Sequence, residues 1–393
     1  MKKLTRETCI IGVGMHKFGK FLDRSLKELS RVAVWSAIHD AGIDAKQIEA
    51  VYFSNVLGGL ITGQEAIRGQ VFLRDSGFEG LPIVNVEGAC ASGSIALQQA
   101  ILGIAAGLYD VVLAVGAEKL YLDDTARSIE AMATNTDVEL MARCGFQFTA
   151  SYSMSLRKYM QKYGWTQEQF ARVAAKNKYN GSMNPYAQYQ NPMSVEEILN
   201  SRIISWPLTL YMCSTMADGA AAAIVCAKER VQKIGARLPV KVAACCLRSG
   251  EVTGEDDGQK RVAFDAYEAA GLGPKDIEVA EVHDAMAPGE MIRIEKLDFC
   301  QPEEVANLAD KGHFALRGRL PVNPSGGLSA RGHPIGATGL AQIVELVWQM
   351  RGEAGARQVK GLSSLYPRVG LAQNSGGNVE GSPAALTVTI LTK

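Results

Sequence analysis

The sequence lacks an excess of charge of either sign. Its 393 residues include 41 lysines and arginines against 41 aspartates and glutamates, so the formal net charge at pH 7 is zero. Proteins that bind nucleic acid or an anionic membrane surface through charge usually carry a basic surplus. We therefore expect neither nucleic acid nor a membrane among the partners.

Long hydrophobic runs are also missing. A membrane-spanning helix needs about 18 or more consecutive apolar residues, and the sequence contains no such stretch. The N-terminal segment MKKLTRETCIIGVGMHKFGK has two early lysines, but its apolar run is too short for a signal peptide and no small-residue cleavage site follows. These features predict a cytoplasmic protein.

The eight cysteines form no C-x-x-C pair and do not group with histidines at zinc-binding spacing. We therefore predict no metal site. Cys226, Cys245 and Cys246 lie in apolar segments, where cysteine behaves as a small buried hydrophobe.

Two segments recur in the same order along the chain. AGIDAKQIE at 41–49 returns as AGLGPKDIE at 270–278, and CASGSIAL at 90–97 is echoed by GATGLAQI at 336–343. Both copies of the first segment stand at the end of an amphipathic helix and precede an apolar strand. Both copies of the second segment stand at the start of a helix whose apolar residues recur with helical spacing. This repetition predicts two similar α/β halves, with the functional site where helix N-termini converge at their junction.

The rhythm of strands and helices is interrupted once. Residues 118–210 are rich in Met, Tyr, Asn and Gln and form an insertion of helices and loops that we expect to act as a lid. The first half then consists of residues 1–117 and 211–235. The second half consists of residues 236–393.

Cys90 stands at a turn between a strand and a helix. The segment GACASG at 88–93 follows the apolar run LPIVNVE and opens the helix. A helix N-terminus favours a thiolate, which predicts a lowered thiol pKa and a nucleophile whose own N–H serves as an oxyanion donor. The alternative is a buried structural cysteine.

Two of the five histidines have sequence contexts that suggest chemistry. His333 lies between glycines in SGGLSARGHPIGATG, and His283 lies at a strand end in AEVHDAMAP. The alternatives are a turn histidine with a structural hydrogen bond and, for His283, a histidine that supports a turn through Asp284. We interpret Asp284 as an orienting or capping residue. A glycine pair in GLAQNSGGNVEG at 370–381 can aim N–H groups at a carbonyl oxygen, or it is a flexible surface turn.

Taken in order, these segments resemble the thiolase superfamily over essentially the whole chain. The resemblance is carried by GACASG, HDA, NPSGG, GHPIGATG and the C-terminal glycine pair. In the insertion, YGWTQEQFA, KNKYNGSMNPYAQ and the following DGAAAAIV resemble the sterol-carrier-protein-type (lipid-transfer-protein-like) thiolases. The implied α/β fold has two duplicated βαβαβαββ halves in a five-layer αβαβα arrangement.

The resemblance also implies roles for individual residues. Cys90 would take the acyl group as a thioester, and His333 would hold Cys90 as the thiolate and help to bind the thioester oxygen. His283 would replace the usual asparagine of the first oxyanion site. The N–H groups of Cys90 and Gly376 would form the second oxyanion hole. Further substrate contacts would come from Met286, Asn374 and Gly377.

The chain departs from the family pattern at its second cysteine. Ordinary thiolases carry this acid/base in a CxGGG-like segment, and sterol-carrier types carry it in HDCF. The corresponding residues here are Asn374 and Ala285, so neither position offers a thiol. The proton must come from His283, from water or from elsewhere, in a Cys-His-His set similar to that of ketosynthases.

This pattern is similar to bacterial and archaeal thiolases that work with a small zinc-ribbon/OB-fold (DUF35-type) partner. That group includes acetoacetyl-CoA and benzoylsuccinyl-CoA thiolases. The resemblance implies that the protein cleaves or forms a 3-oxoacyl-CoA, with CoA as substrate and no permanently bound cofactor. It also implies a homodimeric core within a heterotetramer. The tyrosines and methionines of the insertion would accommodate a bulky or aromatic acyl group, or they pack against the core.

Two other functions stay open at this stage. Related steroid side-chain retro-aldolases share the fold and the partner type, and in such an enzyme Cys90 would be a bystander. A non-catalytic thiolase-like subunit that scaffolds an active partner is the second alternative.

Overall fold

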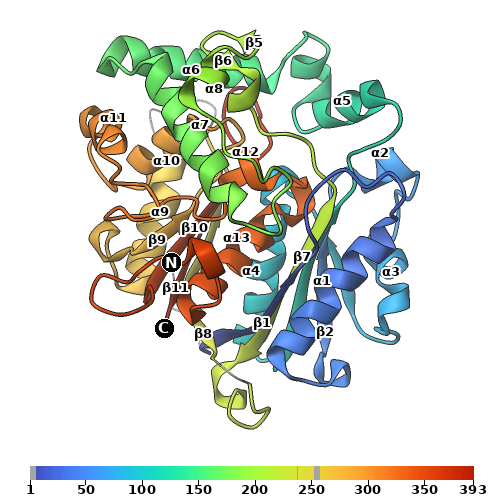
Figure 1. Ribbon diagram of the computed structural model, residues 1–393. Helices are drawn as coiled ribbons and strands as arrows, with labels where there is room; N and C mark the ends of the chain where they lie inside the picture. The colour runs from blue at the N-terminus through green and yellow to red at the C-terminus, as the bar shows by residue number, and fades with distance from the viewer. Residues whose placement is uncertain (1–5, 237, 252–256) are drawn as a thin grey trace.

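A nine-stranded mixed sheet runs through the molecule (Figure 1). The computed structural model describes residues 6–236, 238–251 and 257–393. The strand order is β3-β2-β4-β7-β1-β8-β11-β10-β9. Several strands are buried along their whole length instead of at alternate residues, because both faces of the sheet are covered. The strand bounds are β1 Thr8–Met15, β2 Ala50–Ser54, β3 Ile83–Val86, β4 Val111–Glu118, β7 Gly219–Ala227, β8 Val240–Arg248, β9 Val279–Glu281, β10 Val369–Gly376 and β11 Ala385–Thr392.

The sheet consists of two halves with the same strand order. The first half reads β3-β2-β4-β7-β1, and the second reads β9-β10-β11-β8. Val322 forms a parallel bridge with Ala280 of β9, so it occupies the place that β3 holds beside β2. Three residue pairs between β1 and β8 join the halves. The predicted duplicated α/β fold is therefore present.

The first repeated segment has the same structure in both copies. Helices α1 (Leu26–Ala41) and α9 (Gly258–Ala270) end at Gly42 and Gly271, each with a φ of 67°. Glycine adopts this left-handed conformation at little cost and so stops a helix. A short 3₁₀ turn and then β2 or β9 follow each glycine.

The second repeated segment builds the centre of the fold. Helices α4 (Ser92–Ala105) and α13 (Thr338–Arg351) contact each other and strands of both half-sheets, and both are buried on nearly all sides. A Cβ at Gly93 would lie 3.0 Å from the carbonyl oxygen of Gly336, and one at Gly339 would lie 2.2 Å from Ser94 Oγ. The shared glycine of the repeat therefore lets the two helix N-termini converge.

The three largest apolar cores hold five layers together, because the core around the central helices contacts both half-sheets. One core lies between α1 and the first half-sheet, the second surrounds α4 and α13, and the third lies between the second half-sheet and α9. Figure 1 shows α1 and α9 on the outer faces, with α4 and α13 between them. The other helices that belong to the two halves are α2 Gly58–Thr62, α3 Arg68–Phe72, α10 Gly289–Lys296, α11 Pro302–Asp310 and α12 Gly327–Arg331.

The insertion between β4 and β7 packs on the third core through α6 and α7. Trp165 joins these two helices, and its ring stacks on Tyr159 at 4.6 Å. No helix of the described residues is long and apolar enough to cross a membrane. The insertion contains α5 Thr125–Ala133, α6 Phe148–Tyr163, α7 Gln167–Ser182, α8 Val195–Leu199, β5 Ile203–Ser205 and β6 Leu208–Thr209.

Candidate active site

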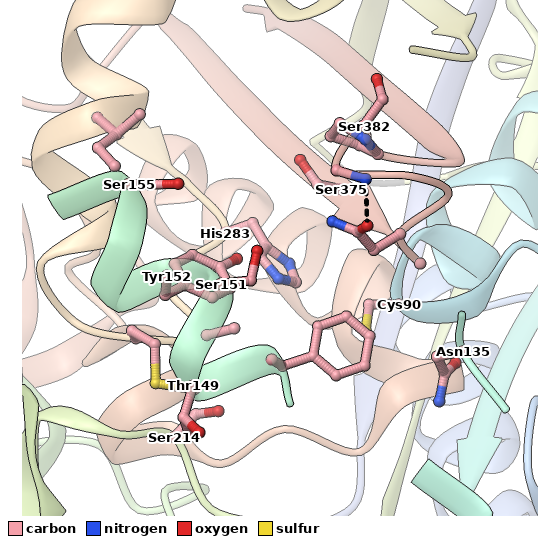
Figure 2. Close-up of a pocket in the computed structure, with 18 of the residues that line it drawn as sticks. Cys90, Asn135, Thr149, Ser151, Tyr152, Ser155, Ser214, His283, Ser375 and Ser382 are labelled. Carbon is pink, nitrogen blue, oxygen red and sulfur yellow. Dashed lines mark hydrogen bonds between the residues drawn. The ribbon is translucent and has the colours of Figure 1, made fainter. Parts of the chain in front are cut away.

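A cavity of about 850 Å³ opens where the two halves meet the insertion (Figure 2). Cys90 comes from the first half, and His283 and His333 come from the second. The insertion contributes aromatic walls, including Phe148 and Tyr152. The three residues predicted to carry the chemistry are therefore brought together at the junction of the halves.

Cys90 lies in the 3₁₀ turn Ala89–Ala91 that precedes α4. Ala89 has a φ of 48°, an uncommon conformation for a residue with a side chain. The end of β10 presses against this turn, because a Cβ at Gly376 would lie 2.1 Å from the carbonyl oxygen of Gly88. A tight, supported turn thus presents the thiol to the cavity.

His333 is oriented toward the thiol by a chain of hydrogen bonds. The hydroxyl of Thr338 donates to the carbonyl of Pro334 at 3.0 Å, so its oxygen must accept from Nδ1–H of His333 at 2.7 Å. This places the lone pair of Nε2 opposite Cys90 Sγ, at 3.2 Å. His333 is therefore held in the tautomer that can take the thiol proton.

His283 is oriented in the same way by Asn374. The amide oxygen of Asn374 accepts from the backbone N–H of Ser375 at 2.8 Å. That oxygen therefore also accepts from Nδ1–H of His283, at 2.8 Å. The unprotonated Nε2 is left for the reaction, and the two histidine rings lie 5.4 Å apart.

The three side chains are neutral in this arrangement. Burial raises the pKa of Cys90 to about 12, although the N–H groups of Gly377 and of Cys90 itself act in the opposite direction. Burial lowers the pKa of His333 to about 3 and that of His283 well below its usual range. The prediction of a lowered thiol pKa is therefore wrong, because desolvation outweighs the helix N-terminus.

Nitrogen and sulfur atoms of Cys90, His283 and His333 lie within 4.8 Å of one another. Imidazole and thiolate are zinc ligands, so this set could hold a metal ion. The same atoms form the thiol–imidazole hydrogen bond, and binding a metal would occupy the groups that the acid–base chemistry needs.

One predicted backbone donor differs from the N–H group that faces the cavity by one residue. Gly376 was expected to supply the second oxyanion N–H, but it ends β10 in register with Ala385 and does not line the cavity. Gly377, with a φ of 62°, lines the cavity and points its N–H at the thiol. The N–H groups that act on the thiol in this structure are therefore those of Cys90 and Gly377.

The other predicted substrate contacts divide into two groups. Met286 and Gly377 line the cavity. Asn374 does not line the cavity, because it is buried behind His283, where it orients the ring. Asp284 accepts from the N–H of Leu328 at 2.7 Å and so caps α12, in agreement with its interpretation as a capping residue.

Two supporting residues were missed at the sequence level. Thr338 stands in the GHPIGATG segment, five residues after His333, but nothing in the pattern assigned it a role. Glu118 ends the apolar strand β4 and accepts from the N–H of Gly336 at 3.1 Å, which anchors the loop after His333. A lone acid at the end of an apolar strand was the available signal.

Comparison with known proteins gives a consistent result. Residues 8–205 match the family model described as "Thiolase, N-terminal domain", and residues 249–391 match "Thiolase C-terminal domain-like". The chain is 38% identical over 390 residues to acetyl-CoA acetyltransferase of Methanothermobacter thermautotrophicus, covering 98% of this chain and 99% of that protein. It is 36% identical over 384 residues to benzoylsuccinyl-CoA thiolase subunit BbsB of Thauera aromatica, covering 95% and 96% of the two chains.

Among solved structures, the chain is similar to one described as "Ltp2-ChsH2(DUF35) aldolase". The TM-score is 0.81 at 26% sequence identity, with 99% of this chain and 98% of that chain covered.

Proposed function

The chain belongs to the thiolase family and is an acyltransferase, and on that basis we propose that it cleaves or forms a 3-oxoacyl-CoA through an acyl-cysteine intermediate on Cys90. The observation that carries this proposal is the 3.2 Å contact between Cys90 Sγ and Nε2 of His333. A neutral thiol attacks poorly, but it becomes a nucleophile when a positioned base takes its proton during attack.

The first step of cleavage uses groups of this chain only. Cys90 Sγ attacks the 3-oxo carbon of the substrate while its proton passes to Nε2 of His333. The developing oxyanion lies at the N–H groups of Cys90 and Gly377. The carbon–carbon bond then breaks and leaves the acyl group on Cys90, while C2 of the released acyl-CoA takes one proton from the pair of histidines. The thiol of free CoA gives its proton to the same pair, attacks the acyl-cysteine and carries the acyl group away as a new thioester, and Cys90 regains the proton.

His283 supplies the acid–base function that a second cysteine provides in other thiolases. In the synthetic direction, Nε2 of His283 takes the proton from C2 of the acyl-CoA, and the carbanion attacks the thioester on Cys90. Cys90 leaves as a thiolate and regains one proton, the one that His283 took from C2, by way of His333. The tautomer set by Asn374 supports this role, because it leaves Nε2 free to accept a proton.

The walls of the cavity support a bulky or aromatic acyl group. Side chains of the insertion face Cys90 across the cavity, and we propose that this segment acts as a lid. One relative of similar length is named for a benzoylsuccinyl-CoA substrate. The wall residues from the insertion include Ile129, Met132, Phe146, Phe148 and Tyr152.

We also propose a homodimeric core, with CoA as substrate and no permanently bound cofactor. β3 forms one edge of the nine-stranded sheet, and the side chain of Val84 on it is 45% exposed. An exposed apolar edge strand is a ready surface for pairing with a second copy. The name of the similar solved structure includes DUF35 and so supports a DUF35-type partner. We propose that the complete assembly is a heterotetramer.

The same similarity favours one rival function, a CoA-dependent retro-aldolase in which Cys90 does not react. The test is to assay thiolysis of a 3-oxoacyl-CoA by free CoA before and after alkylation of the protein at alkaline pH, continued until mass spectrometry shows that Cys90 is fully modified. The proposal predicts two acyl-CoA products and complete loss of activity after alkylation. Carbon–carbon cleavage that persists after alkylation would favour the retro-aldolase.

A further inference from the structure

Within the described residues, one arginine of the cavity wall has no acidic partner. Arg293 projects from α10 into the cavity, and its Nη1 donates to the amide oxygen of Gln259 at 2.5 Å. Its positive charge also acts on the phenol of Tyr152, where it favours a lower pKa against the effect of burial. The Nε atom is buried and has no hydrogen-bond partner within the described residues. The one acceptor that the described residues give this cation is therefore a neutral amide.

Acidic side chains nearby are already paired with lysines. Asp257 pairs with Lys296, and Glu295 pairs with Lys260 at 2.7 Å and with Lys296 at 3.1 Å. Within residues 6–236, 238–251 and 257–393, no carboxylate lies at ion-pair distance from Arg293. The guanidinium is thus a positive charge on the cavity wall that this part of the chain does not neutralise.

An unpaired, half-buried guanidinium is costly, and an anionic ligand would offset that cost. Its planar fork matches a carboxylate, which can accept two parallel hydrogen bonds from it. The amide nitrogen of Gln259 is also buried and unpartnered within the described residues, so a second donor lies beside the arginine. The two side chains together resemble a carboxylate-binding site.

The site lies close to the reacting atoms. The positive charge of Arg293 contributes to lowering the pKa of His283, and Tyr152 feels the charges of both Arg293 and Cys90. In a bound acyl-CoA, the long pantetheine arm separates the phosphates from the thioester. The anion that meets Arg293 therefore belongs to the acyl portion of the substrate.

We infer that the pocket selects a 3-oxoacyl-CoA bearing a carboxylate on its acyl portion, which Arg293 binds with help from Gln259. This inference rests on the proposed thiolase function. The carboxylate belongs either to the acyl part that is transferred to Cys90 or to a substituent at C2. In both cases a carboxylate binds beside Arg293.

The test compares two matched pairs of substrates. For the transferred part, 3-oxoadipyl-CoA is compared with the neutral 3-oxohexanoyl-CoA. For the C2 substituent, 2-(carboxymethyl)acetoacetyl-CoA is compared with 2-propylacetoacetyl-CoA. We expect the wild-type protein to favour the acid in one pair by about tenfold or more in kcat/KM, as a charge-assisted pair would give. The pair of substrates in which the acid is preferred shows which part of the substrate carries the carboxylate.

Variants then assign the preference to the arginine. Arg293→Gln should bring the acid-to-neutral ratio close to one, and Arg293→Lys should keep part of the preference. Arg31→Gln removes an exposed arginine from α1 and should leave the ratio as in the wild type. Equal rates for acid and neutral substrates in both pairs, or an unchanged ratio in Arg293→Gln, would overturn the inference.

Mass spectrometry distinguishes a failure of the proposed function from a failure of the role proposed for Arg293. If no substrate acylates Cys90 in the wild-type protein, the proposed function fails. If acids and neutral compounds acylate Cys90 equally fast, the function stands and only the role of Arg293 fails. The wild-type comparison needs no variant, so poor folding of Arg293→Gln leaves this outcome measurable.

Discussion

Thr338 Oγ1 lies 2.7 Å from Nδ1 of His333, whose other ring nitrogen lies 3.2 Å from the sulfur of Cys90. Because the hydroxyl proton of Thr338 is given to Pro334, this relationship determines which histidine nitrogen carries the proton. One threonine thus turns His333 into a base aimed at the thiol. Several predictions about the reaction depend on this geometry and on the neutral state of the site.

Replacing the nucleophile should stop the reaction without unfolding the protein. Cys90→Ser keeps the shape of the side chain but replaces the thiol by a hydroxyl, and we expect thiolysis to fall by about a thousandfold or more. Cys144→Ser changes an exposed cysteine of the insertion and serves as the matched control, with activity as in the wild type. Steady-state thiolysis and thermal melting measure the two effects. Full activity in Cys90→Ser would remove the central role of the thiol.

Removing the hydroxyl that orients His333 should slow acylation of Cys90. Thr338→Val has nearly the same size, but it leaves Nδ1 without an acceptor, and we expect kcat to fall by about tenfold to a hundredfold. Thr338→Ser restores the hydroxyl and should recover most of the rate. A merely structural role for Thr338 would instead lower the melting temperature of Thr338→Val and leave the rate per folded molecule unchanged.

The two histidines should affect different half-reactions. His283→Ala removes the base for C2 but leaves Cys90 and His333 in place, so carbon–carbon cleavage should slow about tenfold or more beyond any loss in acyl transfer. Acyl transfer is measured separately, as the exchange of an acyl group from an acyl-CoA to labelled free CoA. Equal losses in exchange and in cleavage would argue against proton transfer by His283.

The thiol of the unliganded protein should react slowly with alkylating agents at neutral pH. The pKa of Cys90 is raised to about 12, so the thiolate is a minor species at pH 7 and its fraction rises about tenfold per pH unit up to that pKa. The alkylation rate of Cys90, followed by mass spectrometry from pH 6 to 10, should rise in the same way. A rate that is already high and flat across this range would indicate a preformed thiolate–imidazolium pair.

Much of this fold could be predicted from the repeats. Gly42 and Gly271 end equivalent helices, and Gly93 and Gly339 permit the close approach of α4 and α13, so the positions of glycine alone convey the duplication. The same convergence explains why Cys90 and His333, far apart in the sequence, could be placed in one site. A local sequence pattern is enough to predict the structure at positions where the backbone geometry requires a particular residue.

Other properties could not be predicted, because they depend on several segments at once. The pKa of Cys90 reflects burial by both halves and the insertion, and a turn motif alone does not show that burial. Whether Gly376 or Gly377 supplies the oxyanion donor depends on where β10 ends. The role proposed for Arg293 depends on the lack of an acidic neighbour within the described residues, which the sequence alone does not show.

The most direct test of the account is the intact mass of the protein after brief exposure to a panel of acyl-CoAs, followed by peptide mapping. We predict one acyl group per chain, located on the peptide that contains Cys90 and released by free CoA. The measurement should be made with and without a DUF35-type partner. An acyl-CoA panel that leaves Cys90 unmodified under both conditions, while carbon–carbon cleavage proceeds, would contradict the account.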